Sequence, residues 1–82
     1  MSNQYVEARK ATKKAQRYAV ANELGMGPES EDMRTGLWWE KQFTNAAEIW
    51  HGNKRFHLSR DKKSNTWIVL GTSTSPTFGW SL

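Results

Sequence analysis

The amino-acid sequence predicts an α+β fold, in which a long N-terminal helix packs on a small antiparallel sheet of three to four strands connected as a meander. Residues 2–24 contain neither Gly nor Pro and are rich in helix-forming residues. Residues 37–71 instead hold short β-branched and aromatic runs separated by turn signals. Because 82 residues suffice for one domain but not for two, we expect residues 1–82 to form a single domain.

The helix predicted over residues 2–24 can be capped by Ser2 or Asn3, and Gly25 with Pro28 just beyond it is a typical helix end. At about 100° per residue, one side carries small residues and tyrosines: Tyr5, Ala8, Ala11, Thr12, Ala15, Tyr18 and Ala19. The other side is basic: Arg9, Lys10, Lys13, Lys14 and Arg17. This basic face either contacts phosphates or is a solvated charged face.

Residues 25–36 form a connector with turn signals and three acidic residues, Glu29, Glu31 and Asp32. We expect a loop or a short turn of helix. The acidic residues lack the alternating spacing of a calcium-binding loop. A solvated linker whose carboxylates can pair with the basic helix is the better interpretation.

The first strand is predicted over residues 37–43. Alternation places Leu37, Trp39 and Phe43 on one face of that strand. Trp38, Glu40 and Gln42 then lie on the other face.

Residues 44–52 admit two interpretations. Asn45 followed by Glu48 resembles a capping box, which together with Gly52 favours a helix of about two turns. Alternatively, residues 48–51 form a strand that turns at Gly52-Asn53 into the next strand. We favour the strand, because the following strand needs a partner.

The last hairpin is predicted to pair residues 55–60 with 66–71 through a polar turn at 61–65. Apolar residues occupy both faces of the second arm, which is typical of a central strand that is covered on both sides. Residues 72–82 form a Ser/Thr-rich tail. Its aromatic residues Phe78 and Trp80 are expected to dock either on this sheet or on a partner.

The sequence carries no catalytic, metal or cofactor signature. It contains no cysteine and only two histidines, so thiolate zinc sites are excluded, and no glycine-rich phosphate loop is present. We therefore predict a protein that is not an enzyme and that has no catalytic residues, no metal site and no cofactor. No apolar run is long enough to span a bilayer, and the N-terminus lacks the apolar core of a signal peptide, so we expect a cytoplasmic protein without membrane contact.

The excess of basic over acidic residues favours an anionic partner, either nucleic acid or an acidic protein surface. The formal net charge is +4, and the pI is near 9.7. Our first hypothesis is nucleic-acid binding, to DNA or RNA, through a basic hairpin and the basic helix face. The hairpin residues are Lys54, Arg55, His57, Arg60, Lys62 and Lys63, and the helix residues are Arg9, Lys10, Lys13, Lys14 and Arg17. One continuous basic patch would favour this hypothesis, whereas two separate patches would indicate plain solubility.

The alternative is a small protein-interaction module. Five tryptophans are more than a core of this size needs, and tryptophan is enriched at interaction hot spots. The candidate contact residues are Trp38, Trp50, Phe78 and Trp80. Such a module would be a regulator or inhibitor of a larger partner, of the kind that phages and mobile elements encode, or a small subunit of an assembly.

Overall fold

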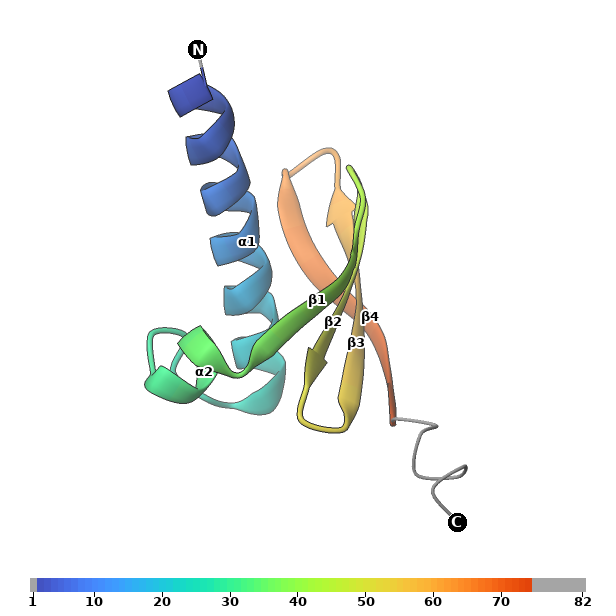
Figure 1. Ribbon diagram of the computed structural model, residues 1–82. Helices are drawn as coiled ribbons and strands as arrows, with labels where there is room; N and C mark the ends of the chain where they lie inside the picture. The colour runs from blue at the N-terminus through green and yellow to red at the C-terminus, as the bar shows by residue number, and fades with distance from the viewer. Residues whose placement is uncertain (1, 75–82) are drawn as a thin grey trace.

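The computed structural model describes the backbone of residues 2–74 and the side chains of residues 7–74. Its elements are α1 (Ser2–Leu24), α2 (Glu31–Thr35), β1 (Leu37–Gln42), β2 (Ala46–His51), β3 (Lys54–Asp61) and β4 (Thr66–Thr74). The strands form one sheet in the order β1-β2-β3-β4, and each strand is antiparallel to its neighbour (Figure 1). This arrangement confirms the predicted helix on an antiparallel meander.

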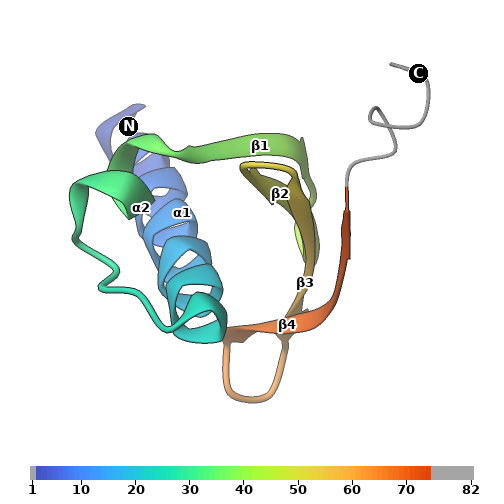
Figure 2. The ribbon, with the colours of Figure 1, turned by 90° about the horizontal axis from the view of Figure 1, so that it is seen from below.

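The fold has two layers, a helix and a curved sheet. Helix α1 lies along one face of the sheet, which we call the inner face, and the sheet bends around it (Figure 2). The opposite, outer face is covered by no element of residues 2–74. Helix α2 lies beside the C-terminal end of α1, so the two layers are closed at that end and open at the other.

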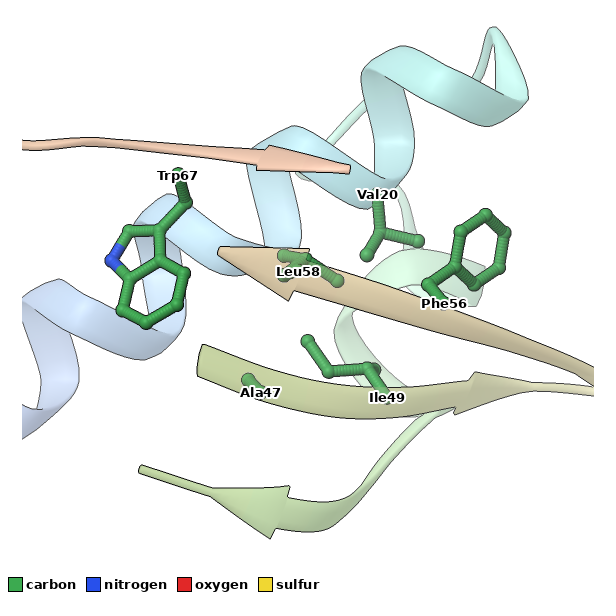
Figure 3. Close-up of a cluster of buried hydrophobic side chains, with 6 residues drawn as sticks. All are labelled: Val20, Ala47, Ile49, Phe56, Leu58 and Trp67. Atoms are coloured by element: carbon green, nitrogen blue, oxygen red, sulfur yellow. The ribbon is translucent and has the colours of Figure 1, made fainter. Parts of the chain in front are cut away.

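The core lies between α1 and the inner face (Figure 3). Its buried members are Val20 from α1, Ala47 and Ile49 from β2, Phe56 and Leu58 from β3, and Trp67 from β4. The strand residues in this set are spaced two apart, so alternation directs all of them to the same face. Burial of these apolar side chains against α1 stabilises the fold.

Residues 46–51 form a strand, as we favoured, and not a helix. They pair with β3 from Ala46 opposite Ser59 to His51 opposite Lys54. Gly52 adopts a φ of 63° in the tight turn between the two strands, a conformation that glycine reaches without steric cost. The hairpin signal at Gly52-Asn53 therefore outweighs the capping-box pattern.

A bulge in β1 makes our assignment of Phe43 to the same face as Leu37 and Trp39 wrong. Trp39 lies opposite Ile49 and Lys41 lies opposite Glu48, so Glu40 is an additional residue on this strand. The extra residue reverses the alternation beyond it. As a result Gln42 turns toward α1, and Phe43 is 62% exposed.

The position predicted for the second arm of the last hairpin is also wrong, because β4 lies at the edge of the sheet and not in its centre. Ile68 and Leu70 face solvent, with Leu70 68% exposed. A second bulge in this pair leaves Leu70 without an opposite residue, since Leu58 pairs with Val69 and His57 with Gly71. The strand continues to Thr74, three residues into the segment that we assigned to the tail.

The connector contains the short helix α2, in agreement with the predicted turn of helix. Ser30 caps its N-terminus by accepting a hydrogen bond from the backbone N–H of Met33, and Met33 is fully buried. The helix ends at Thr35 and is followed by Gly36 as its C-cap, where an added Cβ would lie 2.5 Å from the carbonyl oxygen of Asp32. Glycine is therefore needed for the close turn into β1.

Candidate nucleic-acid interface

A cleft of about 640 Å³ opens between the N-terminal half of α1 and the adjacent end of the sheet. One wall is formed by Ala8, Arg9, Ala11, Thr12 and Ala15 of the helix. The opposite wall is formed by Gln42, Phe43, Thr44, Arg60, Asn65 and Trp67, which come from β1, the β1–β2 turn and the β3–β4 hairpin. Figure 1 shows these two turns at the same end of the molecule as the N-terminal half of α1.

The cleft exists because the helix side chains at this end are small. Val20 and Ala21 near the C-terminal end of α1 are buried, whereas the alanines at 8, 11 and 15 are exposed. An alanine side chain extends only one carbon from the backbone, so three of them cannot fill the gap to the sheet. The part of the predicted small-residue face between Ala8 and Ala15 therefore lines a cleft, whereas Ala19 of the same face packs against the core.

Gln16 marks the boundary between the packed and the open part of α1. It is fully buried, and its Oε1 accepts hydrogen bonds from the indole N–H of Trp39 (2.7 Å) and from Nε2 of Gln42 (2.9 Å). Its own Nε2 donates to Oε1 of Gln42 at 2.8 Å. This arrangement satisfies the buried amide and ties the helix to β1 next to the cleft.

Arg60 is held in position by neutral partners. Its Nε donates to Oδ1 of Asn45 at 2.9 Å, and its NH1 group donates to Oδ1 of Asn65 at 2.6 Å. Asn65 has a φ of 58°, a left-handed conformation that asparagine tolerates in turns. No carboxylate among the described side chains forms an ion pair with Arg60, so its charge is oriented without being neutralised.

Further cations lie in the helix segment and the turn from which Arg9 and Asn65 reach the cleft. Arg9 lines the helix wall, and Lys62 and Lys63 lie in the same turn as Asn65. Residues 7–14 contain four cations and one carboxylate, and residues 60–63 contain three cations and one carboxylate. These two segments, which we call the basic end, carry a net charge of +5, more than the +4 of the whole chain. The rest of the protein is therefore slightly acidic.

The aromatic residues of the cleft differ in accessibility. Trp67 is only 9% exposed and belongs to the core, so it contributes an edge of the wall. Phe43 is 62% exposed at the cleft margin, where the β1 bulge has turned it away from the core. Its ring is available to an external molecule.

The predicted hairpin cations do not form one patch. Arg55 and His57 lie on the outer face, where NH1 of Arg55 is 3.6 Å from Oε1 of Glu48 and Nδ1 of His57 is 3.6 Å from Oε2 of the same residue. Lys54 lies at the opposite end of β3 from Arg60, with its Nζ 5.7 Å from the ring centre of Phe56. Only Arg60, Lys62 and Lys63 remain near the helix cations.

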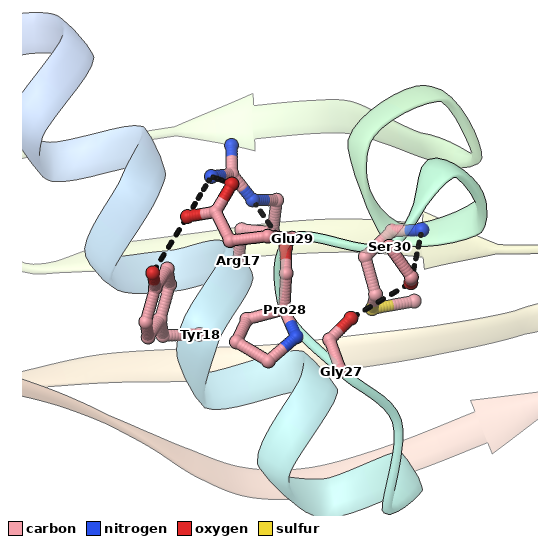
Figure 4. A network of polar contacts seen from close by, with 7 residues as sticks. Arg17, Tyr18, Gly27, Pro28, Glu29 and Ser30 are labelled. Carbon is pink, nitrogen blue, oxygen red and sulfur yellow. Dashed lines mark hydrogen bonds and ion pairs between the residues drawn. The ribbon is translucent and has the colours of Figure 1, made fainter.

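The predicted helix cations also divide. Arg17 points toward the connector, where its Nε donates to the carbonyl of Pro28 at 2.9 Å and its NH2 group to Glu29 at 3.2 Å (Figure 4). The Lys13 ammonium lies 5.1 Å from the ring centre of Trp39, and that of Lys14 lies 5.8 Å from the Tyr18 ring. Lys10 is exposed on the helix surface.

The Arg17 site perturbs two ionisable groups. The Tyr18 hydroxyl donates a 2.6 Å hydrogen bond to Glu29. This bond, assisted by the Arg17 charge, holds the pKa of Glu29 below its usual value, and the same bond raises the pKa of Tyr18. The acidic connector therefore pairs with the end of α1 that is remote from the cleft.

Two of the four residues predicted to contact a protein partner lie together on the outer face. Trp38 is paired across the strands with Trp50 and is 64% exposed. Trp50 donates its indole N–H to Oε1 of Glu40 at 2.6 Å, and its ring is 5.2 Å from the Arg55 guanidinium. Phe78 and Trp80 lie outside the described residues.

Four residues that line the cleft or hold its lining side chains were not among the predicted sites: Phe43 and Asn65 line it, Gln16 bonds Gln42, and Asn45 bonds Arg60. The sequence did carry one usable signal, because Asn45 and Asn65 occupy the two turns that a meander brings to the same end of the sheet as Arg60. None of the helices described over residues 2–74 is sufficiently long and apolar to cross a bilayer. Comparison of the chain with protein-family models, curated proteins and solved structures gives no match.

Proposed function

We propose that this protein binds nucleic acid through its basic end. The observation that carries the proposal is that Arg9 and Arg60 line opposite walls of one cleft, with the Arg60 charge held by two neutral amides. Arg60 is already oriented and forms no ion pair with a described carboxylate, so its guanidinium is suited to bind a phosphate. Lys62 and Lys63 extend the positive surface beyond the cleft, as contact with several phosphates of one strand requires.

The distribution of charge supports nucleic acid over a small anion. Because the basic end carries more than the whole net charge, a polyanion is attracted to this end specifically. Two of the other predicted cations are less suited to bind a phosphate, because they lie beside carboxylates. Arg17 is paired with Glu29, and Arg55 lies beside Glu40 and Glu48.

The test measures the affinity for an oligonucleotide at several salt concentrations. It compares the unmodified protein with two double variants that have the same net charge as each other. Lys62→Gln with Lys63→Gln removes two cations from the basic end, and Arg34→Gln with Lys54→Gln removes two cations from elsewhere. We expect the first pair to reduce the slope of log affinity against log salt by about 1.5, because each lost phosphate contact reduces it by about 0.7 to 0.9. The second pair should leave the slope nearly unchanged.

Two results would contradict the proposal. The first is a lack of measurable binding by the unmodified protein at about 50 mM salt, where phosphate contacts are strong. The second is an equal loss of slope in both double variants, which would indicate attraction by net charge without a defined basic end.

The outer face supports a second candidate function, self-association as a small assembly subunit. Trp38, Ile68 and Leu70 are exposed along its two edges, while the centre carries Glu48 beside His57. Two copies could pack with their outer faces together, related by a two-fold axis that runs parallel to the strands, above the outer face and between β2 and β3. Glu48 of each copy would then lie opposite His57 of the other copy. The same axis would lay the edge with Trp38 over the edge with Leu70, so polar side chains would meet polar ones at the centre and apolar side chains would meet at the edges.

Sedimentation equilibrium over a wide range of protein concentration tests this second function. We expect a monomer–dimer equilibrium that Trp38→Lys abolishes, because the substitution places a charge in the contact. Phe43→Lys is the matched control, since Phe43 is equally exposed but lies at the cleft. A strictly monomeric protein, or equal effects of both substitutions, would rule out the outer face as a dimer contact.

A further inference from the structure

We infer that the cleft receives an unpaired base, so that the protein prefers single-stranded nucleic acid to duplex. This inference rests on the proposed function and names the form of nucleic acid that the same site takes. Its starting point is that the cations and the exposed Phe43 ring belong to one concave site.

The size and lining of the cleft suit a base. Its volume of about 640 Å³ lies within the range of roughly 300 to 1,000 Å³ in which proteins bind small organic groups. Three alanines form the apolar part of the helix wall, beside Arg9 and Thr12. Phe43 stands at the margin, and an aromatic ring in this position can stack on the face of any base.

Polar groups at the cleft can bind the edge of the base and the adjoining phosphates. The Oδ1 atom of Asn65 is used by Arg60, while its Nδ2 group donates no hydrogen bond to any described residue. That group is available to a carbonyl or ring nitrogen of a base. Arg9 and Arg60 flank the space, so a base inside it would have its phosphates next to a guanidinium.

A duplex cannot use this cleft in the same way. Its bases are paired and stacked, and extruding one costs unpairing and unstacking energy. A duplex would therefore contact the lysines and arginines only through its backbone. It would gain the electrostatic part of the binding energy without the contribution of stacking.

The experiment compares three probes of equal length at one salt concentration: single-stranded oligo-thymidine, a single strand of abasic nucleotides, and a duplex. We expect oligo-thymidine to bind about tenfold more tightly than the abasic strand, since stacking of a base on an aromatic side chain is the difference. The two single strands should show the same salt slope, because they carry the same phosphates. The duplex should bind more weakly than oligo-thymidine.

Two pairs of variants test whether the preference for oligo-thymidine over the abasic strand arises at the cleft. Phe43→Ala should remove most of the preference for oligo-thymidine over the abasic strand, whereas Trp38→Ala, at an equally exposed tryptophan on the outer face, should retain it. Ala11→Leu fills the cleft from the helix wall and should act like Phe43→Ala. Asn22→Leu adds the same side chain at an exposed position of α1 outside the cleft and should have no effect.

The outcomes separate this inference from the proposed function. Equal affinity for oligo-thymidine and the abasic strand, with a steep salt slope for both, would overturn the inference and leave nucleic-acid binding in place. Tighter binding of the duplex would also overturn it. If none of the three probes binds at about 50 mM salt, the proposed function itself fails.

Discussion

The closed and open ends of this two-layer fold differ in the partners that their charged side chains have. At the closed end, beside α2, Arg17 is paired with Glu29, and His51 with Asp32 at 2.7 Å. At the open end, Arg60 is held by the amides of Asn45 and Asn65. Arg17 is thus paired with a carboxylate at one end, whereas Arg60 is held by neutral amides at the other.

This difference identifies the end that is suited to binding. An ion pair satisfies both of its members, so a cation in such a pair must lose its partner before it can contact a ligand. A guanidinium that donates to neutral amides keeps its full charge. The closed end therefore serves the stability of the fold, and at the open end Arg60 can contact an anion without first losing a carboxylate partner among the described side chains.

The largest expected effect comes from replacing phenylalanine at the two ends. Phe56 is fully buried, so Phe56→Ala should destabilise the protein by about 3 to 5 kcal/mol through lost burial and a cavity. Phe43→Ala should change stability by no more than about 0.5 kcal/mol, because the ring is exposed. Urea denaturation measures both, and similar losses would contradict the assignment of Phe43 to an open surface.

A smaller effect is expected at the boundary between the two ends. Gln16→Leu keeps the volume of the side chain but leaves the indole N–H of Trp39 without its acceptor. We expect a loss of about 1 to 3 kcal/mol in the free energy of unfolding, the usual cost of such an orphaned group. Asn22→Leu on the exposed side of α1 is the control, and an equal loss there would show that the amide network does not stabilise the boundary.

The smallest effect is a pH dependence at the closed end. Because the pKa of Glu29 is lowered in the folded protein, its contribution to stability is present above the usual value near 4.5 and is lost as the pH falls through the lowered pKa. Because the pKa of Tyr18 is raised, its contribution is present below the usual value near 10.0 and is lost as the pH rises through the raised pKa.

Tyr18→Phe removes the hydrogen bond and retains the ring. The stability difference between the unmodified protein and this variant should be constant from pH 4.5 to 10.0 and should narrow on both sides of that range. Denaturation curves across pH measure it. A difference that does not depend on pH would mean that the hydrogen bond to Glu29 is not formed in solution.

Much of the fold follows from local sequence patterns. Helix α1 is predicted by composition and by its glycine and proline stop signals, and β2 and β3 by alternation around Gly52-Asn53. The bulges are harder to foresee. An extra residue at Glu40 or Leu70 is favoured by pairing with a neighbouring strand, so nothing in the local pattern marks it.

The candidate site was predicted only in part for the same reason. Arg9, Arg60, Lys62 and Lys63 were expected as binding residues, and they do meet at one end. The hypothesis of a hairpin patch also included Arg55. The sequence alone does not show that the Glu48 carboxylate, on the neighbouring strand, lies next to the Arg55 guanidinium. The exposure of Phe43 depends on the β1 bulge, and the orientation of Arg60 depends on two asparagines in separate turns.

The positions of the two bulges have a consequence for the behaviour of the protein at high concentration. Both strands at the sheet edges, β1 and β4, carry one. An edge strand offers unpaired N–H and C=O groups to which a strand from another molecule can add, and repeated addition leads to fibrils. An extra residue interrupts this row and increases the local twist, so a second strand finds no regular register. Each irregularity of the sheet thus protects an open edge from polymerisation.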